Sequence, residues 1–133
     1  MYVFVYGSLK KNFENHFWLL SNTAKFISKA LTSDKSFDLV SVKDSYPSVV
    51  KGDNKIYGEI YEIDNECLRE LDYLEGYPDL YTRNEYLFDT EKGKMKALMY
   101  VMPEETVKKY NSLIKSESPR IYRSDDYVIW GLY

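Results

Sequence analysis

Short runs of β-branched, aromatic and aliphatic residues recur along the chain, and polar turns rich in Gly, Asp, Asn and Lys separate them. This pattern predicts strands, because such runs bounded by turn residues fit an extended backbone that is covered on at least one face. The run at 2–6 is apolar at every position, which indicates a strand covered on both faces. Strands are predicted at 2–6, 25–32, 36–42, 56–63, 84–89, 96–102 and 127–130, with a short extended piece at 46–50.

One stretch follows the helical period instead. Leu68, Leu71 and Leu74 recur at helical spacing, so we expect all of them to face the core. Either residue of the Asp-Asn pair at 64–65 is a suitable cap for the start of this helix. Gly76 suits the left-handed position just past a helix end, so the helix should stop there. A second helix is predicted at 104–113 and a short helical turn at 15–20.

These elements indicate a single α+β domain over residues 1–133, with a small barrel as its expected architecture. No internal repeat, linker or low-complexity tract interrupts the chain. Gly58 lies inside a predicted strand and indicates a bulge or a close approach of another backbone.

Composition excludes several classes of function. The formal net charge of −3 gives no electrostatic reason to expect nucleic-acid binding, and we interpret Lys10-Lys11 and Lys108-Lys109 as solvated surface. No apolar run approaches the length of a membrane span and no signal-peptide pattern is present, so a cytoplasmic protein is expected. The lone His16 has no partners at metal-ligand spacing, the lone Cys67 is interpreted as a packing residue, and no metal or cofactor is expected.

Glu75 is the residue on which the predicted chemistry depends. It lies four residues after Leu71 and seven after Leu68, so it points the way the leucines point. Apolar surroundings disfavour the charged carboxylate and raise its pKa, which suits a group that transfers protons near neutral pH. The alternative is that Glu75 only borders the apolar face and reaches water from the frayed last turn, and helix position alone favours that alternative.

A second candidate is the turn that ends the first strand. Gly7-Ser8-Leu9 follows Tyr6 directly, and a glycine there lets the backbone turn sharply and lets another group come close. Such a turn can aim successive N–H groups into a concavity that binds anions. The alternative is a plain strand-to-helix turn with nothing bound.

Three stretches together resemble the γ-glutamylcyclotransferase-like superfamily, in particular its branch with γ-glutamylamine cyclotransferase and plant avirulence-induced proteins. They are 5–11 (VYGSLKK), continuing to Asn15, the glycine-containing strand 56–61 (IYGEIY) and 71–83 (LDYLEGYPDLYTR). The resemblance implies a mixed β-barrel flanked by short helices. One departure is Asn12, where many relatives have glycine; asparagine tolerates left-handed backbone angles.

The resemblance also implies roles for individual residues. Glu75 aligns with the catalytic glutamate of the family, and the loop of Tyr6, Gly7, Ser8 and Leu9 would hold the γ-glutamyl group of the substrate with backbone donors. Tyr81 falls where a tyrosine follows that glutamate in related enzymes. Tyr122, in the stretch 118–122 (SPRIY), matches a later pocket tyrosine if one residue is inserted.

In the implied reaction the free α-amine of a γ-glutamyl amine or peptide attacks its own γ-carbonyl, which forms 5-oxoproline and releases an amine. The substrate supplies its own nucleophile, which agrees with the absence of a recognisable catalytic triad. The expected partner is this small molecule, and the sequence does not give the leaving amine or the oligomeric state.

Three alternatives remain open on sequence alone. A related cyclotransferase that acts on a biosynthetic intermediate would share the apparatus, and a non-catalytic small-molecule-binding domain would keep only the cavity. The aromatic C-terminal segment 128–133 could instead cover a protein partner, although closure of the barrel is favoured because residues of this kind usually bury.

Overall fold

The computed structural model describes residues 1–7, 9–11, 16, 23–42, 46–110, 114–115 and 121–131. The helical turn predicted at 15–20 lies, apart from His16, outside these ranges. Within them, no helix is long and apolar enough to cross a membrane.

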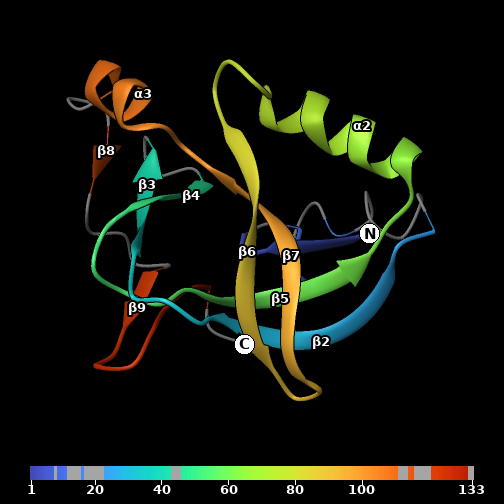
Figure 1. The fold of residues 1–133 in the computed structure, drawn as a ribbon. Helices are drawn as coiled ribbons and strands as arrows, with labels where there is room; N and C mark the ends of the chain where they lie inside the picture. Colours follow the sequence, from blue (N-terminus) through green and yellow to red (C-terminus); the bar gives the residue numbers. More distant parts are fainter. Residues whose placement is uncertain are drawn as a thin grey trace.

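A closed five-strand barrel forms the centre of the fold, with its strands in the order β1-β5-β2-β6-β7 (Figure 1). Neighbouring strands are antiparallel except for β1 and β7, which close the barrel in parallel through Val3 and Leu98. The barrel is therefore mixed, which confirms the predicted fold class. Its strands are β1 (Tyr2–Val5), β2 (Lys25–Thr32), β5 (Tyr57–Glu62), β6 (Thr82–Thr90) and β7 (Gly93–Val101).

Two small sheets flank the barrel, one of order β4-β3-β8 and one of order β10-β9. The predictions did not include β8 or β9, because strands of two and three residues are too short to show an alternating pattern. The elements are β3 (Phe37–Val42), β4 (Tyr46–Lys51), β8 (Ile114–Lys115), β9 (Ile121–Arg123) and β10 (Val128–Trp130).

Helix α2 (Asn65–Glu75) begins and ends as predicted. The Asp64 side chain caps its start by accepting a hydrogen bond from the Cys67 N–H at 2.8 Å, and Gly76 follows its end with φ of 65°. Cys67 and Leu71 are buried, but Leu74 is 39% exposed. The prediction that Leu74 faces the core was therefore wrong, because the last turn of α2 borders a cavity instead.

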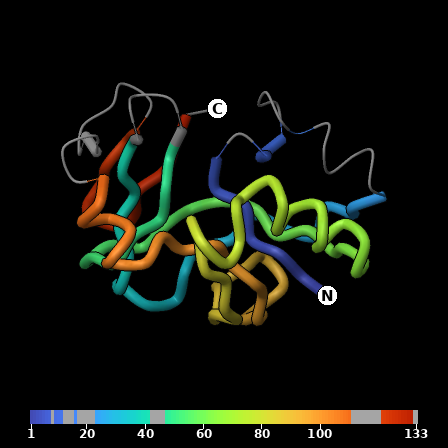
Figure 2. The backbone as a smooth tube through the Cα atoms, turned by 90° about the horizontal axis from the view of Figure 1, so that it is seen from above, coloured from blue at the N-terminus to red at the C-terminus, as the bar shows by residue number. Residues whose placement is uncertain are grey.

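The second helix, α3 (Glu104–Lys109), starts after Pro103 as predicted. It ends before the predicted position 113, and residues 111–113 lie outside the described part of the chain. Figures 1 and 2 both show α2 on one side of the barrel and α3, β3 and β4 together on the other.

Gly58 marks the tightest approach between two barrel strands. A Cβ atom placed on it would lie 2.3 Å from the carbonyl oxygen of Val5 and 2.7 Å from the Phe4 ring. The predicted close approach of another backbone is confirmed, and it holds β1 against β5 directly before the turn at Gly7.

In the C-terminal hairpin of β9 and β10, strand β10 is buried and β9 is the more exposed strand. Val128, Ile129 and Trp130 are buried, and Val128 and Trp130 belong to the same apolar cluster as Phe4 and Phe88 inside the barrel. The hairpin does not join the barrel as a strand but packs beside it. Leu132 and Tyr133 lie outside the described residues.

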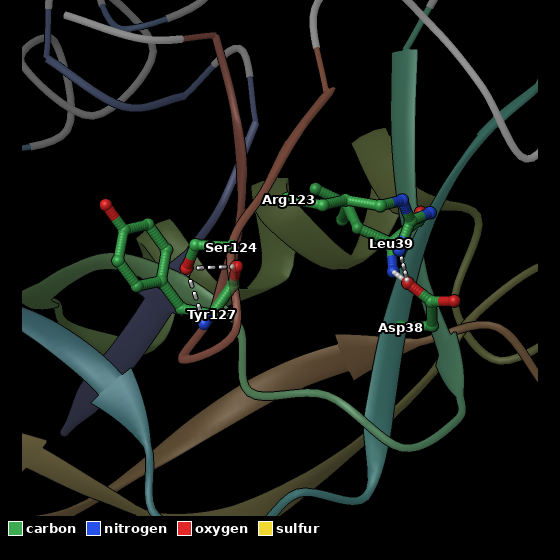
Figure 3. Close-up of polar contacts among 5 residues, drawn as sticks. All are labelled: Asp38, Leu39, Arg123, Ser124 and Tyr127. Carbon is green, nitrogen blue, oxygen red and sulfur yellow. Dashed lines mark hydrogen bonds and ion pairs between the residues drawn. The ribbon is translucent and has the colours of Figure 1, made fainter.

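Polar contacts fasten this hairpin (Figure 3). The Arg123 guanidinium donates to the Asp38 carboxylate at 2.6 Å and to the Leu39 carbonyl at 3.0 Å, which ties β9 to β3. In the turn, the Ser124 hydroxyl accepts from the Tyr127 N–H at 3.1 Å and donates to its carbonyl at 3.2 Å.

Lys10 corrects the interpretation of its basic pair as solvated surface. Lys11 and the pair at 108–109 are exposed, but Lys10 is fully buried and its Nζ donates to the Trp130 carbonyl at 2.6 Å. Burial lowers the pKa of Lys10 to about 8, and the nearby Glu59 carboxylate opposes that shift. Adjacent residues of a turn can point in opposite directions, so one lysine is inside and the other is in water.

Candidate active site

A cavity of about 310 Å³ opens where the end of β1 meets the last turn of α2. These two segments are about 70 residues apart in the chain, and the barrel brings them together. The cavity wall is mainly aliphatic and aromatic. Its lining residues are Phe4, Val5, Tyr6, Gly7, Leu9, Pro47, Leu71, Leu74, Glu75, Leu80, Tyr81 and Tyr100.

Glu75 is the carboxylate residue of this lining. It is half-buried, and desolvation by its surroundings raises the pKa of its carboxyl group to about 7. None of the residues that the structure describes donates a hydrogen bond to this carboxyl group. A carboxyl group with this pKa exchanges protons readily at neutral pH, which is the property expected of a general acid or base.

The turn after β1 lines the same cavity. Tyr6, Gly7 and Leu9 all line the cavity, and the Lys10 N–H donates to the Gly7 carbonyl at 3.0 Å, which closes the turn. A Cβ atom on Gly7 would lie 2.9 Å from Cγ of Pro47, so glycine allows β4 to pack against the turn. Ser8 and Asn12 lie outside the described residues, and the predicted N–H cradle at Ser8 remains a prediction.

Three tyrosines line the cavity, and each hydroxyl group is held by another group of the protein. The Tyr6 hydroxyl donates to the Tyr100 carbonyl at 3.0 Å, and the Tyr100 hydroxyl donates to Oδ1 of Asp72 at 2.6 Å. The Tyr81 hydroxyl is hydrogen-bonded to the Ser48 hydroxyl. The tyrosines therefore present fixed rings to the cavity.

Tyr6 and Tyr100 stay neutral at physiological pH. Burial, followed by the charges of neighbouring groups that include Glu75, raises the pKa of Tyr6 well above its ordinary value. Burial and the hydrogen bond to Asp72 raise the pKa of Tyr100 in the same way.

Tyr122 is not brought to the cavity. It lies on β9 with its side chain 43% exposed, and its ring centroid is 6.3 Å from that of Tyr127. The residues lining the cavity do not include it, so of the two tyrosines suggested by resemblance only Tyr81 reaches the cavity.

Sequence reasoning missed Tyr100 and the hydrogen bonds that hold it. Tyr100 lies in a predicted strand, but nothing in the sequence distinguishes it among fourteen tyrosines. Its partner Asp72 is 28 residues away in the chain, and Arg83 comes from a third element. Only the barrel topology brings these residues together.

Comparison with known proteins identifies the family of this chain. Residues 3–127 match the family model described as γ-glutamyl cyclotransferase, AIG2-like. A Methanocaldococcus jannaschii protein, provisionally named a γ-glutamylcyclotransferase, is 42% identical over 77% of this chain and 85% of its own length. The Danio rerio γ-glutamylaminecyclotransferase A is 39% identical over 68% of this chain, and the match spans 60% of its own length.

A solved structure shows the same fold. The crystal structure of an AIG2-like protein from Mus musculus superposes with a TM-score of 0.74 and 28% identity, covering 93% of this chain and 88% of that one. The chain therefore belongs to the AIG2-like γ-glutamyl cyclotransferase family, as its sequence motifs indicate.

Proposed function

We propose that the protein cyclises the γ-glutamyl group of a γ-glutamyl amine or peptide to 5-oxoproline and releases the amine, with Glu75 as general acid and base. One observation carries the proposal: a carboxyl group with a pKa of about 7 lies in a cavity shared with the glycine turn at the end of β1. The family supports the substrate class.

The first step is a proton transfer. The substrate α-ammonium has no free electron pair, so it becomes a nucleophile only after it loses a proton. The ionised Glu75 carboxylate accepts that proton and becomes a neutral acid, a state that its desolvated position favours.

The second step forms the ring. The α-amine nitrogen attacks the γ-carbonyl carbon, and the electron pair of the C=O bond moves to the oxygen. When this oxyanion collapses, the bond to the leaving amine breaks and protonated Glu75 donates its proton to the departing nitrogen. The ring nitrogen, which carries a positive charge after the attack, loses its extra proton to water or to the released amine, and the neutral lactam ring of 5-oxoproline forms. One carboxyl group thus serves as base and then as acid.

The other residues of the cavity would bind and orient the substrate. Backbone N–H groups of the turn at Tyr6 to Leu9 would bind the substrate α-carboxylate or the oxyanion. The buried ring of Tyr81, with Tyr6 and Tyr100, would keep the substrate folded so that its amine lies close to its γ-carbonyl.

A panel of γ-glutamyl amines and γ-glutamyl dipeptides tests the proposal. We expect release of 5-oxoproline, measured by chromatography, from at least one member. Binding detected by calorimetry without any product would instead indicate a non-catalytic binding domain. If only a biosynthetic γ-glutamyl intermediate gave product, the proposed reaction type would stand and the proposed substrate would be wrong.

The pH dependence of kcat/KM should report the ionisation of Glu75 in the free enzyme. Glu75 must be ionised to accept a proton, so kcat/KM should rise with pH and level off above its pKa of about 7. Below that pKa we expect a fall of about tenfold per pH unit. A profile that stays flat from about pH 5.5 to 8 would exclude Glu75 as the base.

A further inference from the structure

A hydrogen-bonded cluster behind the cavity wall joins three elements around one carboxylate. Asp72 lies on α2, one helical turn before Glu75, and accepts three hydrogen bonds. Arg83 of β6 donates from Nε to Oδ1 at 2.7 Å and from Nη2 to Oδ2 at 2.9 Å. The Tyr100 hydroxyl of β7 donates to Oδ1 at 2.6 Å. We refer to Asp72, Arg83 and Tyr100 as the Asp72 cluster.

The geometry fixes the guanidinium of Arg83 on two sides. Its carboxylate partner holds it in the bidentate arrangement, and its Cζ atom lies 4.4 Å from the ring centroid of Tyr77. The hydrogen bonds from Arg83 and Tyr100 outweigh partial burial and lower the pKa of Asp72, so its carboxylate stays ionised at neutral pH. The cluster therefore contains one positive and one negative charge, and the two offset each other.

We propose that Asp72 is a positioning residue of this site, which holds the Tyr100 hydroxyl and the Arg83 charge away from Glu75 so that the Glu75 carboxyl group stays unpaired and able to take up a proton. The inference rests on the proposed function for its catalytic meaning. Its physical content, the environment of Glu75, does not require any reaction.

The charges around Glu75 make this assignment specific. Three phenols share the cavity with it, Tyr6 from the end of β1, Tyr81 before β6 and Tyr100 from β7, and all of them are hydrogen-bonded. Among the described residues of the cavity wall and the cluster behind it, Asp72 and Arg83 supply the formal charges besides Glu75 itself. These two charges offset each other in the wild type, where desolvation is the cause of the raised pKa of Glu75, and removing either charge alone should shift that pKa.

Two single variants should shift the pKa of Glu75 in opposite directions. Asp72→Asn leaves Arg83 uncompensated and free to approach Glu75, so we expect a fall of about one unit. Arg83→Met leaves the negative charge of Asp72 uncompensated, so we expect a rise of about one unit. The double variant Asp72→Asn/Arg83→Met removes both charges and should return to within about 0.3 unit of the wild type.

NMR titration of the Glu75 side-chain carboxyl carbon measures these shifts on the full chain without substrate. Asp38→Asn is the matched control, because it removes the negative charge of another arginine–aspartate pair, with Arg123 (Figure 3). Asp38 does not line the cavity. The control should leave the titration of Glu75 unchanged. Shifts of the same sign in both single variants, or none in either, would overturn the inference.

Activity gives a second readout. In Asp72→Asn the rising limb of the kcat/KM profile should move to lower pH by the same amount as the pKa of Glu75 measured by NMR. The fall in kcat should be larger than the rise in KM. A lower rate with an unmoved limb would mean a merely structural role and would overturn the inference. If Asp72→Asn does not fold, Arg83→Met alone tests the inference: a rise in the pKa of Glu75 would support it, and a fall or no change would overturn it.

The two proposals fail separately. If the protein releases no 5-oxoproline but the two variants shift the pKa of Glu75 in opposite directions, the role of the Asp72 cluster stands and the proposed reaction is wrong. If the protein is active but neither variant shifts the pKa of Glu75, the proposed reaction stands and the proposed role of the Asp72 cluster is wrong.

Discussion

Replacing Glu75 with Gln should lower kcat for 5-oxoproline release by about 10²- to 10⁴-fold, the range for loss of a general acid–base group. Glutamine has nearly the shape of glutamate but cannot take a proton from the substrate ammonium or return one to the leaving amine. Because Glu75 accepts no hydrogen bond from the described residues, the substitution should break no protein contact there. Chromatographic measurement of 5-oxoproline gives the rate directly.

The stability of the same variant provides its control, and the sign follows from linkage. The folded-state pKa of Glu75 is about 7 against an ordinary value of 4.5, so its contribution to stability is fully present below pH 4.5 and is lost as pH rises through 7. The Gln variant should therefore match the wild type near pH 4.5 and be more stable above pH 8. Allowing for partial exposure, we expect a gain of about 2 kcal/mol in the free energy of unfolding.

Two results would contradict this interpretation. Full activity in Glu75→Gln would remove the residue from the mechanism, whatever its pKa. Loss of activity together with loss of stability at every pH would show that the substitution damages the fold, so the rate would say nothing of proton transfer.

Gly58→Ala should have the largest effect on stability among simple substitutions in the barrel. The added Cβ would meet the Val5 carbonyl at 2.3 Å and the Phe4 ring at 2.7 Å, and a backbone oxygen in a paired strand cannot move aside. We expect the free energy of unfolding to fall by about 3 kcal/mol or more, as for an overpacked core. Urea denaturation at constant pH measures the loss.

Gly93→Ala is the matched control for this prediction. A Cβ atom on Gly93 would meet nothing within 4 Å, but its φ of 95° is unfavourable for alanine. Its cost should come from the backbone alone, about 1–2 kcal/mol. If Gly58→Ala lowers the free energy of unfolding no more than Gly93→Ala does, strands β1 and β5 can move apart to accept the added Cβ atom, and the prediction is wrong.

The sequence predicted well wherever one element carries a complete local signal. The strand predicted at 25–32 has the bounds of β2. The helix was predicted to start after Asp64 or Asn65 and to stop at Gly76, and it does so with Asp64 as its cap, because its period, cap and stop all lie within the element. Local signals failed where a neighbour decides the outcome. Leu74 has helical spacing but borders a cavity, and Lys10 has a surface composition but donates to Trp130 in the interior.

The candidate site divides in the same way. Glu75 and the turn at Gly7 could be identified because their motifs are contiguous, and the structure brings them to one cavity. The Asp72 cluster could not be identified, because Asp72, Arg83 and Tyr100 meet only after α2, β6 and β7 are packed. Tyr122 was suggested by a gapped match, and it lies on the separate β9–β10 hairpin instead.

The bond from Lys10 to the Trp130 carbonyl spans 120 residues and links the turn that borders the cavity to the C-terminal hairpin. Strand β10 thus supports the turn that borders the cavity, although it contributes no side chain to the cavity itself. We therefore expect that a change at the β10 end of the described chain would disturb the candidate site from a distance, through Lys10.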